Sequence, residues 1–150
     1  MRLKVIITAL VATLLAATVS VSPAYAVDSG QIGSQANPTG SMTCQAHQGA
    51  TACFEKYGDK LWINNSDLDP RHTRNEWENW LWSGSEWILY RWGECLDNGV
   101  GWYVCNKDFY ENSSVNYLGE KGSHIFWRAC EYGQSSGWTC GGWRSTPNDG

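Results

Sequence analysis

The stretch that decides the fold reads WILYRWGEC from Trp87 to Cys95, LDNGVG from Leu96 to Gly101 and WYVC from Trp102 to Cys105. Two runs rich in large apolar residues flank a short segment with two glycines, and glycine adopts the positive φ angles that tight turns require. The pattern predicts two β-strands that fold back on each other and are joined by a Cys95–Cys105 disulfide. We expect the rest of the chain to repeat this strand–turn–strand arrangement.

The spacing of the six cysteines supports that expectation. Eight or nine residues separate the members of three neighbouring pairs, and all other separations are longer. Closing a loop of this size stabilises the folded state by about 2.5–3 kcal/mol in the chain-entropy model. A zinc site is the alternative, but zinc sites usually contain closely spaced CxxC pairs, which the sequence lacks. We therefore predict no metal and three local hairpin disulfides: Cys44–Cys53, Cys95–Cys105 and Cys130–Cys140.

The first residues have the pattern of a secretory signal peptide. Arg2 and Lys4 precede an apolar run from Val5 to Val19, and Ala24-Tyr25-Ala26 offers small residues around a cut after Ala26. The apolar run is short for a membrane span, although a retained anchor is the alternative reading. We expect a signal peptide at residues 1–26, a flexible leader at 27–42, one β-rich domain at 43–145 and a frayed tail at 146–150.

Composition narrows the range of partners. Removal of Arg2 and Lys4 with the signal lowers the formal net charge of the 150-residue chain from −4 to −6. An acidic chain without a cluster of basic residues is a poor partner for nucleic acid or an anionic membrane surface. We therefore expect a secreted, extracellular monomer that binds neither nucleic acid nor, after signal cleavage, a membrane.

Short aromatic-rich runs separated by glycine turns and polar loops predict the fold class. Leu61–Ile63, Asn75–Trp82, Trp87–Trp92 and His124–Cys130 are predicted strands, and no long helical pattern appears. This indicates an all-β fold, a compact antiparallel β-sandwich or alternatively a small barrel. We expect Trp62, Trp87 and Trp127 in the core, because each lies in an apolar run.

Several motifs resemble a group of small secreted bacterial domains without an established activity. These motifs are WRAC from Trp127 to Cys130, TCGGW from Thr139 to Trp143, CNKDFYE from Cys105 to Glu111 and GDKLWI from Gly58 to Ile63. The resemblance covers most of the chain between Cys44 and Trp143. It implies an exported, disulfide-linked, β-rich domain, and it carries no catalytic residue over to this chain.

Tryptophan carries the strongest functional signal, since all ten lie after the expected signal peptide. Flat exposed indoles pack against sugar rings, and neighbouring amide and carboxylate groups bind hydroxyls. Burial of the same indoles in the core is the structural alternative. The first hypothesis is a non-catalytic module that binds a glycan or cell-envelope ligand on an aromatic face. We expect that face to be formed by Trp77, Trp80, Trp82 and Trp102.

Two further hypotheses use other residues. A protein-binding effector, such as an inhibitor or toxin, would use the braced loop Leu96–Gly101. A small hydrolase would use Glu76 and Glu78, which share one face of a strand and imitate a glycosidase pair. The oxygen-rich loop from Asn64 to Asp69 lacks the glycine and the distal glutamate of a calcium loop, so it is interpreted as a solvated loop. No motif predicts a cofactor.

Overall fold

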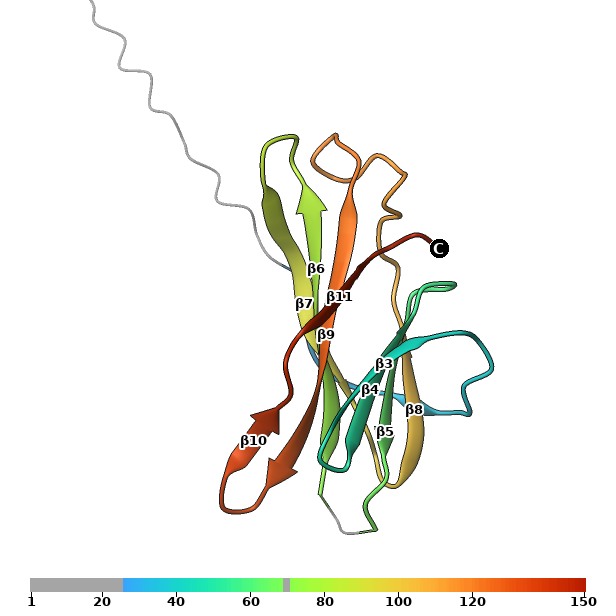
Figure 1. Cartoon of the computed structure of the whole chain (residues 1–150), viewed down its shortest axis with the longest axis vertical. Helices are drawn as coiled ribbons and strands as arrows, with labels where there is room; N and C mark the ends of the chain where they lie inside the picture. Colours follow the sequence, from blue (N-terminus) through green and yellow to red (C-terminus); the bar gives the residue numbers. More distant parts are fainter. Residues whose placement is uncertain (1–25, 69–70) are drawn as a thin grey trace, which may run out of the picture.

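The computed structural model describes residues 26–68 and 71–150, which form two β-sheets packed face to face (Figure 1). The expected signal peptide, apart from Ala26, lies outside the described residues. No described segment forms a helix that is long and apolar enough to cross a bilayer. The strands are β1 Ala26–Ile32, β2 Ser34–Gln35, β3 Thr43–His47, β4 Ala50–Glu55, β5 Lys60–Asn65, β6 Thr73–Trp82, β7 Trp87–Leu96, β8 Gly101–Asn106, β9 Ser123–Gly133, β10 Gly137–Cys140 and β11 Arg144–Pro147.

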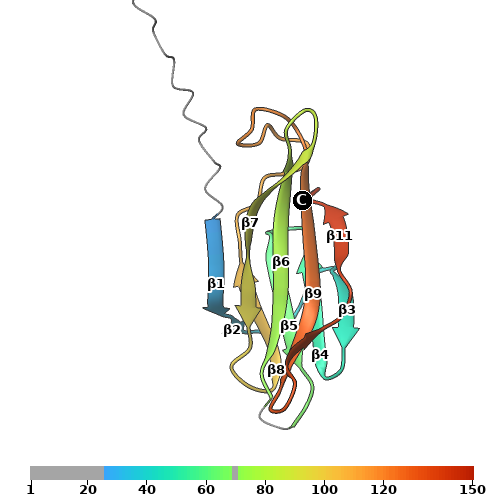
Figure 2. The same cartoon turned by 90° about the vertical axis from the view of Figure 1, so that its left-hand side faces the viewer.

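The topology confirms an all-β sandwich rather than a closed barrel. The first sheet has the order β1-β7-β6-β9-β10, and β11 pairs with another part of β9. The second sheet has the order β2-β8-β5-β4-β3. All pairings are antiparallel except that of β1 with β7, which is parallel. Each sheet keeps open edges, and Figure 2 shows β6, β7 and β9 of the first sheet facing the viewer.

The core lies between the sheets and follows from strand alternation. In β6, every second residue from Thr73 to Leu81 is buried, because successive side chains of a strand point to opposite faces. Trp77 and Trp127 enter the core from the first sheet and meet Phe54 of the second sheet and Phe109 of a loop. Burying such a side chain contributes on the order of 1.5–3 kcal/mol. Trp62 and Trp127 are both buried as expected. Trp127 lies between the sheets, whereas Trp62 alternates with the core residues Leu61 and Ile63 and is buried against Trp102 on the outward side of the second sheet.

All three predicted disulfides are present. Cys44–Cys53 joins β3 to β4, and Cys130–Cys140 joins β9 to β10, in each case between directly opposed residues. Three disulfides in so small a β domain are consistent with an extracellular protein.

The Cys95–Cys105 bridge does not have the predicted hairpin setting. β7 pairs with β1 and β6, whereas β8 pairs with β5 and β2, so Cys95–Cys105 joins the two sheets instead of closing a hairpin. Asp97 follows β7 directly, and its carboxylate accepts hydrogen bonds from the Thr73 backbone N–H of the first sheet and from the Asn65 amide of the second. These bonds direct the chain from the first sheet across to the second.

The expected flexible leader is also wrong, because β1 and β2 form edge strands within it. Asp28 of β1 accepts a hydrogen bond from Arg91 at 2.7 Å and pairs with Lys107 at 3.3 Å. Burial opposes ionisation of Asp28, but these two cations outweigh it and hold the pKa of Asp28 below its ordinary value. Burial lowers the pKa of Lys107, although Asp28 opposes this shift.

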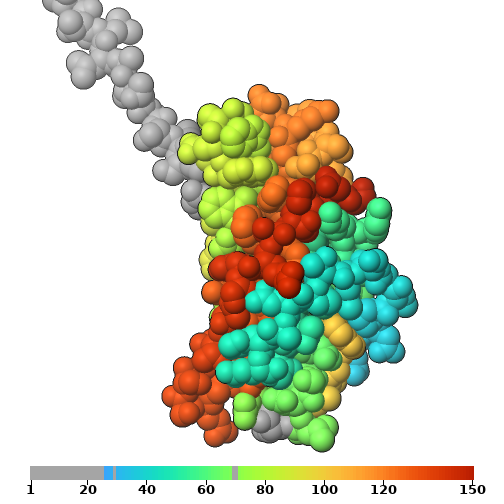
Figure 3. All heavy atoms as spheres, viewed as in Figure 1, coloured from blue at the N-terminus to red at the C-terminus, as the bar shows by residue number. Residues whose placement is uncertain are grey.

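The expected frayed tail is ordered as well. β11 pairs with the edge of β9, and the red C-terminal residues lie against the body of the molecule in Figure 3. Asn148 is buried, and its amide donates to Asp59 at 2.9 Å and to the Tyr110 carbonyl at 3.1 Å. Burial raises the pKa of Asp59 despite the hydrogen bonds from Phe109 and Asn148. A buried polar side chain with partners stabilises the tail, since leaving those groups unpaired is costly.

Candidate ligand-binding face

The four tryptophans expected on one face lie in three different places. Trp77 is 1 % exposed and belongs to the core, so its expected exposure is wrong. Trp80 and Trp82 lie on the outward side of β6 and are half-buried. Trp102 lies on the outward side of the second sheet, where its ring meets the edge of Trp62. Successive side chains of β6 point to opposite faces of the sheet, so Trp77 points to the core while Trp80 and Trp82 point outward.

The outward side of the first sheet nevertheless collects a continuous set of functional side chains, which we call the outer face. The register of β6 with β7 and β9 places these residues in rows across three strands. Figure 2 shows the three strands side by side and uncovered by the second sheet. The outer face consists of Arg74, Glu76, Glu78, Trp80 and Trp82 from β6, Trp87, Leu89, Trp92 and Glu94 from β7, and His124, Phe126 and Arg128 from β9.

One end of the outer face is aromatic. The Trp82 and Trp87 rings lie 5.5 Å apart, and the His124 ring lies 4.6 Å from Trp87. Trp80 meets Phe126 edge-on at 6.2 Å. Trp87 was expected in the core but is 39 % exposed, because its side chain points away from the second sheet. Burial lowers the pKa of His124, and the charge of Asp149 opposes this shift.

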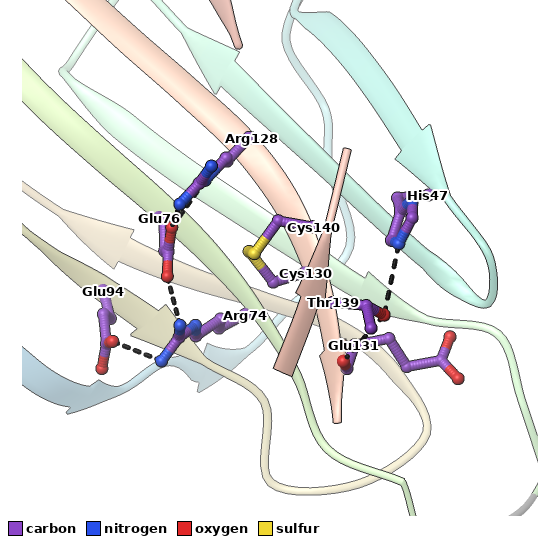
Figure 4. The surroundings of a disulfide bond; sticks show 9 residues. All are labelled: His47, Arg74, Glu76, Glu94, Arg128, Cys130, Glu131, Thr139 and Cys140. Carbon is purple, nitrogen blue, oxygen red and sulfur yellow. Dashed lines mark hydrogen bonds and ion pairs between the residues drawn. A yellow bond between two sulfur atoms is a disulfide. The ribbon is translucent and has the colours of Figure 1, made fainter. Parts of the chain in front are cut away.

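The middle of the outer face carries a chain of alternating charges (Figure 4). Arg74 bridges Glu94, at 2.5 Å, and Glu76. Arg128 binds the other oxygen of Glu76, with Nε 2.6 Å from Oε2. These side chains are largely shielded from water, which strengthens charge-assisted hydrogen bonds. Both oxygens of Glu76 are therefore occupied by guanidinium groups.

Two tryptophans from the C-terminal segment cover these arginines. The Arg74 guanidinium lies 4.1 Å from the ring centre of Trp138, and that of Arg128 lies 4.4 Å from the ring centre of Trp143. Each cation–π contact contributes roughly 0.5–1 kcal/mol at an exposed site. The Cys130–Cys140 disulfide, which Figure 4 shows beside Glu76, fixes the segment of the chain that carries Trp138 and Trp143. The disulfide therefore closes the β9–β10 hairpin and also positions the Trp138 and Trp143 rings over the two arginines.

A hollow of about 210 Å³ opens in the outer face between the charged chain and the exposed indoles. Trp92 is 38 % exposed and Trp143 is 41 % exposed. We call this site the central hollow. It is lined by Glu76, Glu78, Trp92, Glu94, Arg128 and Trp143, with Trp77 and Gly93 also at its border.

Glu78 differs from the other two carboxylates of the central hollow. Its Oε2 accepts a hydrogen bond from the Trp80 indole N–H at 2.7 Å. Within residues 26–68 and 71–150, Glu78 has no ion-pair partner. Trp92 lies directly opposite Glu78 in the β6–β7 register, and no other described ring or cation stacks on it. The hollow therefore contains one unneutralised carboxylate beside one indole with no stacking partner.

Sequence reasoning missed Trp87 and Trp92 as members of this face. The signal for Trp87 was present, because Ser83–Glu86 forms a short turn that places Trp82 opposite Trp87. Trp92 had no such signal. A bulge between Asn79 and Trp80 shifts the register, so the alternation counted from Trp87 does not place Trp92.

The other candidate residues do not converge on a second site. Asn65 is buried and bonded to Asp97 and the Arg71 carbonyl, whereas Asp69 of the expected solvated loop lies outside the described residues. Among the described side chains, one cluster has metal-ligand spacing, formed by Glu76 and the Cys130–Cys140 pair. Its sulfurs are joined in a disulfide, and metal binding requires the thiolate.

Comparisons of the chain with models of known protein families, with characterised proteins and with solved structures found no match. The features of this chain that indicate a function are therefore those of the outer face itself. Its residues combine exposed indoles, carboxylates and a hollow on a rigid three-strand surface, and this arrangement is suited to binding.

Proposed function

We propose that this protein is a secreted, non-catalytic module that binds an extracellular or cell-envelope glycan on the outer face of the first sheet. The observation that carries the proposal is the central hollow, with Trp92 and Trp143 exposed beside carboxylates. Indoles pack on the C–H faces of sugar rings, and carboxylates accept hydrogen bonds from hydroxyls. This mode of binding needs no positive net charge on the protein.

The rigidity of the outer face supports recognition of a ligand. Strands β6, β7 and β9 are paired along most of their length, and the arginine–glutamate chain holds side chains between them. Side chains that are already ordered lose little conformational freedom on binding, which favours affinity.

Export belongs to the same proposal. The basic and apolar start of the sequence, the small residues before Val27 and the three disulfides support secretion. Cleavage after Ala26 would remove a single residue of β1 and would leave Asp28 in place. A bacterial source rests on the resemblance of the WRAC, TCGGW, CNKDFYE and GDKLWI motifs.

The test combines pull-down with glycan polymers and titration of tryptophan fluorescence. Trp92→Ala and Trp143→Ala should each weaken binding about tenfold, because removal of an aromatic contact costs on the order of 1–2 kcal/mol. Tyr57→Ala is the matched control, since Tyr57 is 72 % exposed and lies outside the outer face. No binding by the wild-type protein across a broad glycan panel would reject the proposal.

A protein-binding effector is the second candidate, supported by two exposed apolar residues outside the outer face. Leu68 is 94 % exposed and Val100 is 46 % exposed, and both border one shallow pocket. Exposed apolar residues beside a braced loop are typical of protein contacts. Protein capture that is lost in a Leu68→Ser, Val100→Ser double variant, but retained in Trp92→Ala, would favour this function.

A small hydrolase has less support. Both Glu76 oxygens bind guanidinium groups, so this side chain offers no free oxygen to a substrate or a water molecule. Glu78 would then have to act without the second carboxylate that most glycosidases use. Hydrolysis of a glycan by the wild-type protein, lost in Glu78→Gln, would favour this function over simple binding.

A further inference from the structure

We propose that the central hollow selects a sugar residue that carries a free, positively charged amine. This inference rests on the proposed glycan-binding function and names the class of sugar. The hollow is lined by the carboxylates of Glu76, Glu78 and Glu94. The guanidinium groups of Arg74 and Arg128 form ion pairs with Glu76 and Glu94. Both arginines bind Glu76 or Glu94, so the unneutralised charge is that of Glu78.

An ammonium group completes the hydrogen bonding of Glu78. One oxygen of this carboxylate accepts from the Trp80 indole, and the other has no partner among the described residues. An ammonium group donates up to three hydrogen bonds, and a charge-assisted bond is about twice as strong as a neutral one. A sugar hydroxyl would satisfy the same oxygen without neutralising its charge.

Trp92 supplies the second half of the recognition. Its ring lies across the strand pair from Glu78 and carries no stacked partner among the described residues. The face of an indole attracts a cation held within about 6 Å of the ring centre. The ring also packs on the C–H groups of a pyranose, so one indole contacts both the charge and the apolar part of an amino sugar.

The hollow has a volume of about 210 Å³ and opens onto the outer face, so one sugar ring can enter it while the rest of a longer glycan stays outside. Longer glycans would extend along the outer face toward the half-buried Trp80 or toward Trp143. Anionic sugars are disfavoured, since their carboxylate would approach Glu78.

The experiment compares oligomers of glucosamine with oligomers of N-acetylglucosamine of the same length, by titration calorimetry at constant ionic strength. The wild-type protein should bind the amine form about tenfold more tightly. Glu78→Gln should abolish this preference, because it should weaken binding of the amine form much more than binding of the acetylated form. Glutamine keeps an oxygen for the Trp80 indole, so the fold should be retained. Glu86→Gln is the matched control, because Glu86 is exposed in the turn after β6 and lies outside the hollow.

The outcomes separate this inference from the proposed function. Equal affinity for both oligomers, with no effect of Glu78→Gln, would overturn the amine preference and leave glycan binding intact. A tetralysine peptide that binds more tightly than the glucosamine tetramer would also overturn it, in favour of a basic peptide. If wild-type protein binds neither oligomer nor any other glycan in the panel, the proposed function itself is wrong.

Discussion

Arg128 stacks on the ring of Trp143, with 4.4 Å between the guanidinium carbon and the ring centre, while its Nε donates to Glu76 at 2.6 Å. One side chain therefore joins β9, β6 and the segment after the Cys130–Cys140 disulfide. This contact decides where the Trp143 indole lies at the edge of the central hollow. The stability of the sheet and the shape of the binding face thus depend on the same residue.

Substitution of Arg128 should affect both stability and binding. Arg128→Met keeps the apolar stem but removes the bond to Glu76 and the cation over Trp143. The free energy of unfolding should fall by about 1–2 kcal/mol, as measured by chemical denaturation. Glycan affinity should fall as well, because Trp143 loses its support. Arg128→Lys is the control and should recover part of the stability but little of the stacked geometry. An unchanged affinity in Arg128→Met would contradict the positioning role.

The disulfides Cys130–Cys140 and Cys44–Cys53 should differ in their effects on glycan binding by the outer face. Removal of Cys130–Cys140 with a double serine variant should cost about 2.5–3 kcal/mol and also weaken glycan binding. The Cys44–Cys53 disulfide closes a loop of similar length on the second sheet, so its removal should cost a similar amount of stability. The glycan affinity of this second variant should stay at the wild-type level under conditions where both variants are folded. Equal losses of glycan affinity in the two variants would show that Cys130–Cys140 stabilises the fold but does not position the binding face.

The core position of Trp77 leads to a third prediction. Trp77→Ala should lower the free energy of unfolding by about 3–5 kcal/mol, because it removes a large side chain buried between the sheets. Trp80→Ala, two positions along the same strand, should cost less, since Trp80 is half-buried on the outer face. Denaturation curves of the two variants measure the difference. A larger loss of stability for Trp80→Ala would show that the core lies on the side of β6 that carries Trp80, contrary to the structure.

The attachment of β1 should depend on pH through Asp28. The folded-state pKa of Asp28 lies below the ordinary value of 3.8, so its contribution to stability is fully present well above pH 3.8. This contribution is lost as the pH falls through the folded-state pKa, where the carboxylate is protonated and releases Arg91 and Lys107. The protection factors of the β1 amides, which correct hydrogen exchange for its intrinsic pH dependence, should therefore fall in this acid range.

The matched variant for that experiment is Asp28→Asn, which cannot ionise. It should show low protection factors for the β1 amides at neutral pH and little further change in them on acidification. Asp59 acts in the opposite direction, because its raised pKa favours the folded state as the pH falls. An identical fall of the protection factors in acid in the wild-type protein and in Asp28→Asn would assign the effect to another group.

The sequence by itself determined the parts of this protein that depend on near neighbours. Runs rich in aromatic and other large apolar residues predicted the strands from β5 to β9, and cysteines nine or ten positions apart predicted all three bridges. Short loops close at little entropic cost, so such pairings follow from spacing alone. The tryptophan content of the sequence also predicted an aromatic binding face, without deciding which tryptophans form it.

The tertiary structure alone decided which sheet each strand joins and which side of each strand faces the core. It placed β7 and β8 in different sheets, buried Trp77 and left Trp87 exposed. β7 carries bulky residues on both sides, so its pattern does not distinguish the core side from the outer side. That choice depends on where the second sheet packs, and a shift of one residue in strand register reverses every side chain. The central hollow exists because the segment after a distant disulfide returns to the same face of the first sheet.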